Sequence, residues 1–448
     1  MRTENTYPLS FEQRDYLSRG HTGFGTIAAC TEISGPIDFE VLTRAAQYVI
    51  GRNQPLRMRL TRCPEGLRQA FAEPDLVDVD WVSLTMAARG DIYRHASEKL
   101  DAQQNKPLKL KFLRQDEKQA YLVALLDHLA CDGWSSYLFL EQLWNTYRVV
   151  ARGEKPDPRP MRYEYSDYVL DQQRSASRRP GGAAAYWRDR AERFAVSDSG
   201  LSPRGPAVAD GGRADLVGDI EREGVGEARH LAQSLGLSPN IIPLGCIALA
   251  AWSMSDRDSV GLSFIYAGRD NPRTRSMLGL FRRYVSLVAE RIHEGTVASF
   301  LAELSKATLD AVLRSRPPYL AGEFEAAVER LRGRPAVDIL YNQVDQVFGE
   351  DQIGRVAQVD SRTIVEAVGD PHFSAARWRG FSEGRLRLVL SGGERPSLQA
   401  IFNQGCVAED DARCVLDRTV ALIEGMRPHV AGRPVREFVR STLGQALR

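Results

Sequence analysis

Residues 121–135 read YLVALLDHLACDGWS, and this stretch is the most informative part of the chain. The apolar run that opens it, residues 121–126, has the composition of a buried β-strand. An amphipathic helical pattern follows, from about Ser135 to Val149. Between the two lies H-x-x-x-D-G, with His128, Asp132 and Gly133 at the fixed places. The pattern predicts a strand that delivers one imidazole to a strand-to-helix turn.

Histidine at such a turn suggests proton-transfer chemistry, because its ordinary pKa lies close to operating pH. Asp132 would hold the turn or orient the ring, and Gly133 would allow backbone or substrate to approach closely. The alternative is that His128 is a satisfied core residue and the short pattern an accident. The rest of the chain has to decide between these interpretations.

Composition sets broad limits on the class of protein. The chain has 448 residues, 43% of them apolar and 26% charged, with a formal net charge of +1. These values are typical of a soluble globular protein of two or more domains. The near-neutral charge gives no electrostatic case for nucleic acid or an anionic membrane as partner. The beginning of the chain has no apolar signal segment, and no apolar run is long enough to cross a bilayer.

The six cysteines show neither C-x-x-C spacing nor a Cys/His cluster with zinc spacing. They imply no disulfide framework, so we expect a reducing, cytoplasmic location and no metal. Cys131 lies between His128 and Asp132, and we interpret it as a small buried packing residue.

Strand-like and helix-like patterns alternate along the chain, which favours an α/β or α+β protein. The pattern over Phe39–Ile50 predicts a helix with Asp38 as N-cap and Gly51 at its C-terminal end. Residues 196–212, rich in Ser, Gly, Pro and Asp, are the best linker candidate. The remaining predicted elements are strands at 108–114, 120–127, 259–266, 284–292, 336–341 and 386–390, and helices at 225–237, 241–254 and 410–426.

Several segments, taken in order, resemble the condensation domains of nonribosomal peptide synthetases, within the chloramphenicol-acetyltransferase-like acyltransferases. The family patterns are S-x-x-Q-x-R-L-W, R-H-E-x-L-R, H-H-x-x-x-D-G, Y-x-D-[YF], Y-W, G-R and G-x-F-x-N-x-L-P-L-R. The similar segments here are residues 9–13, 52–57, 127–133, 165–168, 186–188, 267–270 and 279–288, with 338–342 where a strand ending in Asn is usual. The ordered likeness over most of the chain is more specific than any single motif.

Departures from the family pattern occur at several positions. Asp127 replaces the first His of the active-site motif, and Asp15 stands where the opening pattern has Arg. Arg283, Ser286 and Val288 stand where the family commonly has Asn, Pro and Arg. No D-F-G-W-G-like bridging segment is present near the end of the sequence. These departures put the bridging contacts and the acceptor specificity in doubt.

The resemblance implies an α/β fold of the α+β sandwich type, with two chloramphenicol-acetyltransferase-like lobes in a V-shaped pseudo-dimer around a central channel. We expect an N-terminal lobe over residues 1–175 that carries the motif, a connecting helix and linker over 176–212, and a C-terminal lobe over 213–448. No adenylation or carrier-protein region is recognisable, so the chain resembles a free-standing, monomeric member of the family.

The activity that the resemblance implies is condensation in natural-product biosynthesis. An acyl group would pass from the phosphopantetheine thioester of an acyl or peptidyl carrier protein to a small-molecule amine or alcohol, forming an amide or ester. The protein itself would bind no cofactor. His128 would be the catalytic residue, and backbone N–H groups near Gly133 would bind the oxyanion. Asp132 would be structural, with Arg57 as its predicted partner.

Five further residues are expected to line the channel or contact substrate: Asp127, Trp134, Ser135, Tyr284 and Asn342. Trp134 also suits core packing at the start of the helix, and Ser135 suits a helix cap better than a nucleophile. Asp127 has two interpretations. It is a tolerated replacement, or it is a carboxylate that raises the pKa of His128 or recognises a cationic acceptor.

Two other functions stay open at this point. An acyltransferase of the same fold could use acyl-coenzyme A, which presents the same pantetheine thioester. A non-catalytic condensation-like domain could instead recruit a partner enzyme. Because His128, Asp132 and Gly133 are all present, the sequence favours an enzyme.

Overall fold

A computed structural model describes residues 5–18, 25–73, 81–85, 90–98, 100, 106–156, 161–178, 183–197, 199–201, 213–255, 257–290, 294–333, 338–343, 357–358, 364–367, 386–391 and 396–446. They form two compact units. The first unit comprises Met1–Pro180, Ala267–Arg282 and Val347–Phe381, and the second comprises Gly181–Tyr266, Arg283–Gln346 and Ser382–Arg448. This division differs from the contiguous C-terminal lobe expected over residues 213–448, because two segments from the second half of the chain belong to the first unit. The α/β class and the two lobes are confirmed.

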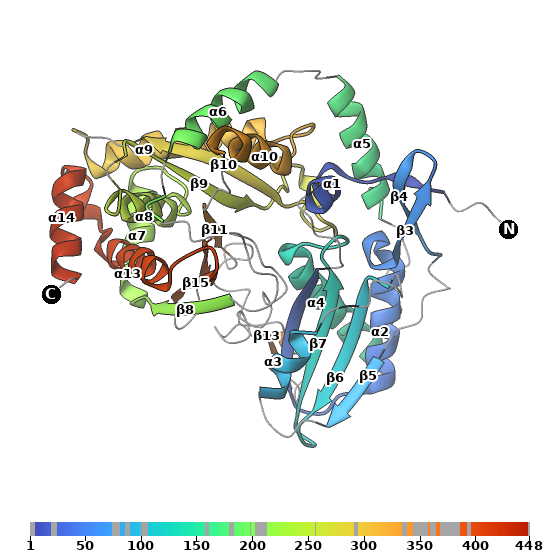
Figure 1. The fold of residues 1–448 in the computed structure, drawn as a ribbon. Helices are drawn as coiled ribbons and strands as arrows, with labels where there is room; N and C mark the ends of the chain where they lie inside the picture. The colour runs from blue at the N-terminus through green and yellow to red at the C-terminus, as the bar shows by residue number, and fades with distance from the viewer. Residues whose placement is uncertain are drawn as a thin grey trace. The chain divides into compact units, whose positions relative to one another are not determined.

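The first unit is built on a six-stranded sheet with the order β12-β13-β2-β7-β6-β5 (Figure 1). All its strand pairs are antiparallel except the β5–β6 pair. The strands are β12 (Ala357–Gln358), β13 (Ile364–Ala367), β2 (Thr26–Ser34), β7 (Gln119–Asp127), β6 (Leu108–Arg114) and β5 (Trp81–Thr85). A separate three-stranded sheet contains β1 (Tyr7–Pro8), β4 (Gly66–Phe71) and β3 (Met58–Cys63).

The first unit's helices are α1 (Phe11–Ser18), α2 (Phe39–Arg52), α3 (Gly90–Ala96), α4 (Gly133–Ala151) and α5 (Tyr165–Ser177), with the 3₁₀ turn η1 (Gln54–Arg57) after α2. Helices α3 and α2 cover opposite faces of its six-stranded sheet. Ile92 and Ala96 of α3 pack with Cys30 of β2 and Val123 of β7. The ring of Phe39 in α2 meets Phe112 of β6 on the other face, with centroids 5.6 Å apart. β7 is therefore covered on both sides, which explains why its sequence is a continuous apolar run.

The second unit is built on another six-stranded sheet, with the order β10-β9-β11-β14-β15-β8. Its strands are β10 (Arg283–Glu290), β9 (Ser259–Tyr266), β11 (Ile339–Gln343), β14 (Leu386–Ser391), β15 (Ser397–Asn403) and β8 (Arg213–Asp219). Its helices are α6 (Ala184–Val196), α7 (Arg222–Ser234), α8 (Ile241–Trp252), α9 (Val297–Arg314), α10 (Ala321–Arg332), α13 (Glu409–Gly425) and α14 (Val435–Ala446), with the 3₁₀ turn η6 (Pro428–Val430) before α14.

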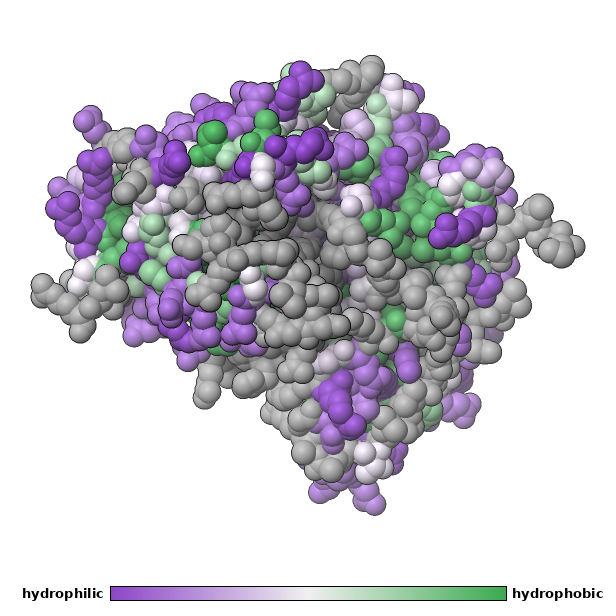
Figure 2. Space-filling view, in the orientation of Figure 1, coloured by the Kyte–Doolittle hydropathy of each residue, from purple (hydrophilic) through white to green (hydrophobic). Residues whose placement is uncertain are grey.

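The second unit's helices differ in how deeply they are buried. α8 is buried at every position, as its uniformly apolar sequence predicts. α6 packs so closely on β9 that a Cβ atom on Gly261 would lie 2.8 Å from the Phe194 ring. α14, by contrast, has hydrophilic residues over its outer side (Figure 2). Among the described residues, no helix has both the length and the apolar content needed to span a bilayer.

Most predicted elements are confirmed, with small shifts at their ends. Asp38 caps α2 by accepting the backbone N–H groups of Glu40 and Val41 at 2.9 and 3.1 Å. The predicted end at Gly51 is wrong. The helix continues through Arg52, because Asn53 caps it instead and donates its side-chain amide to the Val49 carbonyl at 2.8 Å. Of the predicted linker, residues 198 and 202–212 lie outside the described part of the chain.

Candidate active site around His128

The turn between β7 and α4 is closed by Asp127, the last residue of the strand. Its backbone carbonyl accepts the N–H groups of Ala130 and Cys131 at 3.0 and 2.9 Å. Its side chain accepts the N–H of Leu129 at 2.9 Å. Three hydrogen bonds to one residue make the turn tight, and they fix the backbone position of His128. The predicted strand-to-helix delivery of the imidazole is confirmed.

The orientation of the His128 ring is set by its own turn. Nδ1 lies 3.0 Å from the carbonyl oxygen of Cys131. Because a carbonyl oxygen can only accept, Nδ1 carries the hydrogen and Nε2 carries the lone pair. The Nε–H of Arg282 lies 3.3 Å from Nε2. The Tyr16 ring lies beside the imidazole, with centroids 5.2 Å apart. The arrangement presents one nitrogen base with a guanidinium at its basic atom.

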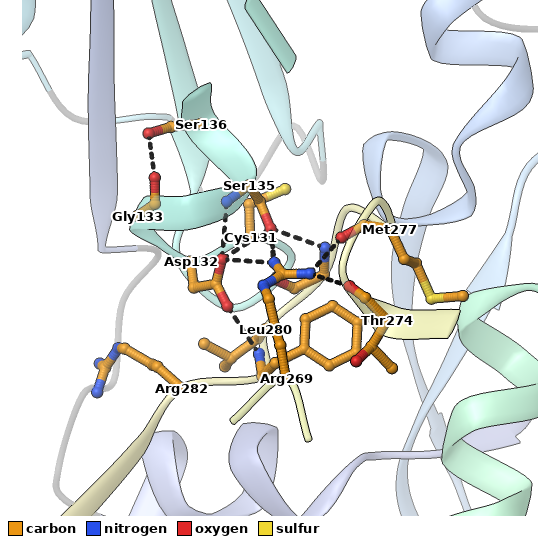
Figure 3. Close-up of polar contacts among 12 residues, drawn as sticks. Cys131, Asp132, Gly133, Ser135, Ser136, Arg269, Thr274, Met277, Leu280 and Arg282 are labelled. Atoms are coloured by element: carbon orange, nitrogen blue, oxygen red, sulfur yellow. Dashed lines mark hydrogen bonds and ion pairs between the residues drawn. The ribbon is translucent and has the colours of Figure 1, made fainter. Parts of the chain in front are cut away.

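The carboxylate of Asp132 accepts four hydrogen bonds from the described residues (Figure 3). Oδ1 accepts the Ser135 N–H at 2.8 Å, the Ser135 hydroxyl at 2.8 Å and the Arg269 guanidinium at 3.0 Å. Oδ2 accepts the Phe281 N–H at 3.0 Å. Asp132 is therefore the N-cap of α4 and also joins the motif to residues 267–282. This geometry supports the structural role expected of Asp132.

The partner of Asp132 is Arg269, so the prediction of Arg57 is wrong. The side chains of Arg269 and Asp132 are only 2% and 3% exposed. Arg57 ends the 3₁₀ turn η1 and donates to the backbone carbonyl of Ala72. Burial lowers the pKa of Arg57, and the charges of Glu164 and Glu73 oppose that shift. Arg57 thus supports its own segment, away from the carboxylate of the motif.

Arg269 belongs to a loop, residues 267–282, that leaves β9 and returns as β10. Its guanidinium donates to the Met277 carbonyl at 2.6 Å and to the Thr274 carbonyl. It also lies over the Phe281 ring, 4.3 Å from the centroid. The preceding Gly268 has φ +69°, and a Cβ there would lie 1.8 Å from the Phe281 carbonyl oxygen. Only glycine fits at that position, and it lets the loop fold back on itself with Arg269 at the centre.

The S-x-x-Q segment supports the turn from the other side. Ser10 and Gln13 exchange hydrogen bonds at the start of α1, Ser10 N–H to Gln13 Oε1 at 2.8 Å and Gln13 N–H to Ser10 Oγ at 3.1 Å. The Gln13 amide also donates to the carbonyl of Leu129 at 3.1 Å. This buried contact fixes the residue next to His128.

The Y-x-D-[YF] segment has a similar supporting role. The hydroxyl of Tyr165 lies 3.2 Å from the Leu280 carbonyl and 3.3 Å from Ser10 Oγ. Its ring packs edge-on against Phe281, and a Cβ on Gly279 would lie 2.5 Å from it. α1, α5 and the 267–282 loop therefore converge on the motif turn.

The other predicted site residues separate into two groups. Ser135 is not the cap of α4, since Asp132 occupies that place. Its hydroxyl instead bonds Asp132 and the Gly279 carbonyl. Trp134 lies beside Arg269, with the guanidinium carbon 5.2 Å from its ring.

Tyr284 and Asn342 belong to the second unit, where Tyr284 is buried with Ala321 and Leu340. Their predicted contact with substrate stays a prediction.

The buried acid and thiol beside His128 are both kept neutral by their surroundings. Burial raises the pKa of Asp127 to about 8, although the Leu129 N–H opposes the shift. Burial and the nearby carboxylates raise the pKa of the Cys131 thiol well above its ordinary range. This favours Cys131 as a packing residue. It also favours Asp127 as a neutral replacement over Asp127 as a charged recognition group.

Tyr16, Gln13, Arg269 and Arg282 are site residues that the sequence analysis did not assign. Arg269 and Gln13 lie inside segments already noticed for their family likeness, so a signal for them was present. Arg282 also lies inside a family-like segment, residues 279–288, but at a variable position of its pattern, so the likeness did not single it out. Among the described residues, no group of three or more His, Cys, Asp or Glu side chains is placed to hold a metal ion.

The comparisons with known proteins identify the family of the chain. The condensation-domain family model matches residues 3–326. The isonitrile lipopeptide synthase of Mycobacterium tuberculosis is 26% identical over 416 residues, which are 86% of this chain and 16% of the synthase. The chain thus spans only a small part of that relative.

Solved structures share the fold at low sequence identity. Holo-AB3403, a four-domain nonribosomal peptide synthetase bound to AMP and glycine, superposes with a TM-score of 0.76 and 14% identity, over 98% of this chain and 34% of that one. The X-domain in its complex with OxyB from teicoplanin biosynthesis superposes with a TM-score of 0.71 and 16% identity, over 98% of this chain and 96% of that one. With the family model over most of its length, this chain belongs to the condensation-domain family of nonribosomal peptide synthetases.

Proposed function

We propose that the chain is an acyltransferase that joins an acyl group, presented as a phosphopantetheine thioester, to an amine or hydroxyl acceptor. Condensation domains work on substrates carried by phosphopantetheine, which makes a carrier protein the proposed donor. Coenzyme A carries the same pantetheine thioester and is the alternative donor.

The observation that carries this proposal is the geometry of His128. Its Nδ1–H is bound to the Cys131 carbonyl, so Nε2 is the atom that can take a proton. As the acceptor nitrogen or oxygen attacks the thioester carbonyl, its proton passes to Nε2. The new C–N or C–O bond forms, the C–S bond breaks, and the leaving thiolate takes the proton back. General-base help of this kind contributes about 10²–10⁴-fold to a rate.

The remaining groups of the site have supporting roles in the proposal. Backbone N–H groups at the start of α4, next to Gly133, are the proposed donors to the oxyanion, because the first N–H groups of a helix have no partner within the helix. Asp132 and Arg269 keep that helix start in place against the 267–282 loop. No metal is needed, since a thiolate is a good leaving group.

The experiment is a product search by intact mass. Wild-type protein is mixed with acyl-pantetheine, acyl-coenzyme A or an acyl-carrier protein and a panel of amines and alcohols. His128→Ala is the test variant, and His230→Ala, at an exposed position of α7, is the matched control. Transfer by wild type and His230→Ala but not by His128→Ala supports the proposal. Transfer by none of the three from any donor contradicts it.

A second candidate is a domain that binds a partner enzyme without catalysis. It is favoured by one observation, the similarity to an X-domain found in complex with OxyB. Partner binding that is unaffected by His128→Ala, together with no acyl transfer, would support this candidate. The retained His128, Asp132 and Gly133 favour the enzyme.

A further inference from the structure

Arg282 is the last residue of the 267–282 loop and lies at the basic atom of His128. Its Nε is 3.3 Å from Nε2 of the imidazole, and its guanidinium carbon lies 5.8 Å from the centre of the Tyr16 ring. In Figure 3 its side chain points away from the Asp132–Arg269 cluster. The side chain is only half-buried, unlike that of Arg269. Arg282 therefore lies apart from the Asp132–Arg269 cluster, at the imidazole.

A guanidinium at this place opposes the proposed chemistry. Nε2 has to accept a proton during the reaction, which makes the imidazole a cation. Arginine stays charged at any working pH, so the two cations would repel across about one hydrogen-bond length. The Arg282 N–H also points at the lone pair that the proton must reach. A carboxylate that draws the guanidinium away from Nε2 would leave that lone pair open to the proton.

We propose that Arg282 binds a carboxylate of the acceptor, so that the acceptor is a free α-amino or α-hydroxy acid. This inference rests on the proposed function. The reacting nitrogen or oxygen of the acceptor must lie within hydrogen-bond distance of Nε2. In an α-amino or α-hydroxy acid, the carboxylate carbon is two bonds from that atom, which places it beside the guanidinium. The planar fork of arginine matches a carboxylate with two parallel hydrogen bonds.

Other anions fit this place less well. The phosphate of phosphopantetheine lies at the far end of the arm from the thioester, away from the reacting carbonyl. An acceptor held on a carrier protein has its carboxyl group tied up as a thioester, so it presents no anion here. A carboxylate on the acyl group is the remaining source of the same chemistry, and the acyl donor can be varied separately.

The test uses matched acceptor pairs, each a free acid and its primary amide, with acyl-pantetheine as donor. The kcat/KM ratio of acid to amide is measured for wild type, Arg282→Ala, Arg282→Lys and Arg275→Ala. Arg275 is exposed in the same loop and is the control. The reacting groups of the acid and of its amide differ in basicity, and comparing the acid-to-amide ratio between proteins cancels that difference. We expect Arg282→Ala to lower the ratio about ten- to hundred-fold. The ratio for Arg282→Lys should lie between those of wild type and Arg282→Ala, and the ratio for Arg275→Ala should match that of wild type.

In Arg282→Ala the kcat/KM of the acid should fall. The kcat/KM of the amide should stay level or rise, because Nε2 of His128 no longer has the guanidinium beside it. Equal ratios in wild type and Arg282→Ala would overturn the inference and leave the acyltransferase standing. A ratio that depends on a carboxylate in the acyl donor would overturn the assignment to the acceptor. Arg282→Gln replaces Arg282→Ala if the latter fails to fold, as judged by its urea midpoint.

If wild type transfers to no acceptor, the proposed function fails, and equilibrium binding of the same pairs then decides the inference. Tighter binding of the acids than of the amides, lost in Arg282→Ala but not in Arg275→Ala, would still support a carboxylate site at Arg282. Equal binding in all three proteins would overturn it.

Discussion

Replacing Arg269 by methionine removes the cation that joins the 267–282 loop to the start of α4. Methionine keeps part of the length and the apolar contact with Phe281. It cannot replace the hydrogen bonds to Asp132, Ser135 and the two loop carbonyls. The carboxylate of Asp132 is then left as a buried charge with only the hydroxyl and two N–H groups around it.

The expected cost follows from the burial of the pair. Both side chains are almost completely shielded from water, at 2% and 3% exposure, so solvent screens their attraction little. Breaking such a pair from one side typically costs about 3–5 kcal/mol. Arg269→Met and Asp132→Ala should each lose stability in this range. The double variant should lose less than their sum by at least about 1 kcal/mol, because neither charge is then left alone.

Urea unfolding with unchanged m values measures these differences, and hydrogen exchange localises them. The amides of Ser135 and Phe281, which donate to Asp132, should exchange faster in both single variants. Arg275→Ala, in the same loop, should stay within about 0.5 kcal/mol of wild type. An Arg269→Met protein as stable as Arg275→Ala, with unchanged exchange at both amides, would refute the reasoning.

Three smaller changes test other parts of the site. Asp127 binds its proton more tightly in the folded state, so its contribution to stability is full below about pH 4 and is lost as pH rises towards about 8. The free energy of unfolding of Asp127→Asn should therefore rise by a few kcal/mol relative to that of wild type between pH 5 and pH 8. The acceptor KM of this variant should be unchanged. A stability difference between the two proteins that does not depend on pH would contradict this prediction. Gly25→Ala should slow transfer at least tenfold, since its Cβ would lie 2.0 Å from the Tyr16 hydroxyl and force that ring to move; an unchanged rate would show that the ring does not matter. Gln13→Leu removes the donor to the Leu129 carbonyl and should cost about 1–3 kcal/mol in urea unfolding, and a loss under 0.5 kcal/mol would contradict the supporting role.

Local features of the site were predictable because they depend on neighbouring residues. The apolar run into Asp127 marks a strand covered on both faces, and Asp38 is followed at once by the helix that it caps. The family likeness also indicated, in chain order, the segments that converge on the turn. The position of His128 needed only the strand, the turn and the helix, all within about thirty residues.

The long-range contacts could not be predicted in the same way. Arg269 and Asp132 are 137 residues apart in the chain, and no local pattern shows which arginine reaches which carboxylate. Arg57 lies in a family-like segment, but its position at the end of η1 directs it to the Ala72 carbonyl. Arg282 belongs to no periodic pattern and to no helix cap. The role proposed for it depends on its contact with the imidazole of His128, 154 residues away in the chain. Ser135 resembled a cap because caps favour serine, whereas Asp132 three residues earlier takes that place.

The most direct test of the account is the rate of acyl transfer by His128→Ala beside wild type, both shown by urea midpoints to be equally folded. The account predicts a fall in kcat of about 10²–10⁴-fold, because the atom that takes the acceptor's proton is gone. A variant that transfers the acyl group within threefold of the wild-type rate would contradict the central claim that His128 Nε2 acts as the base.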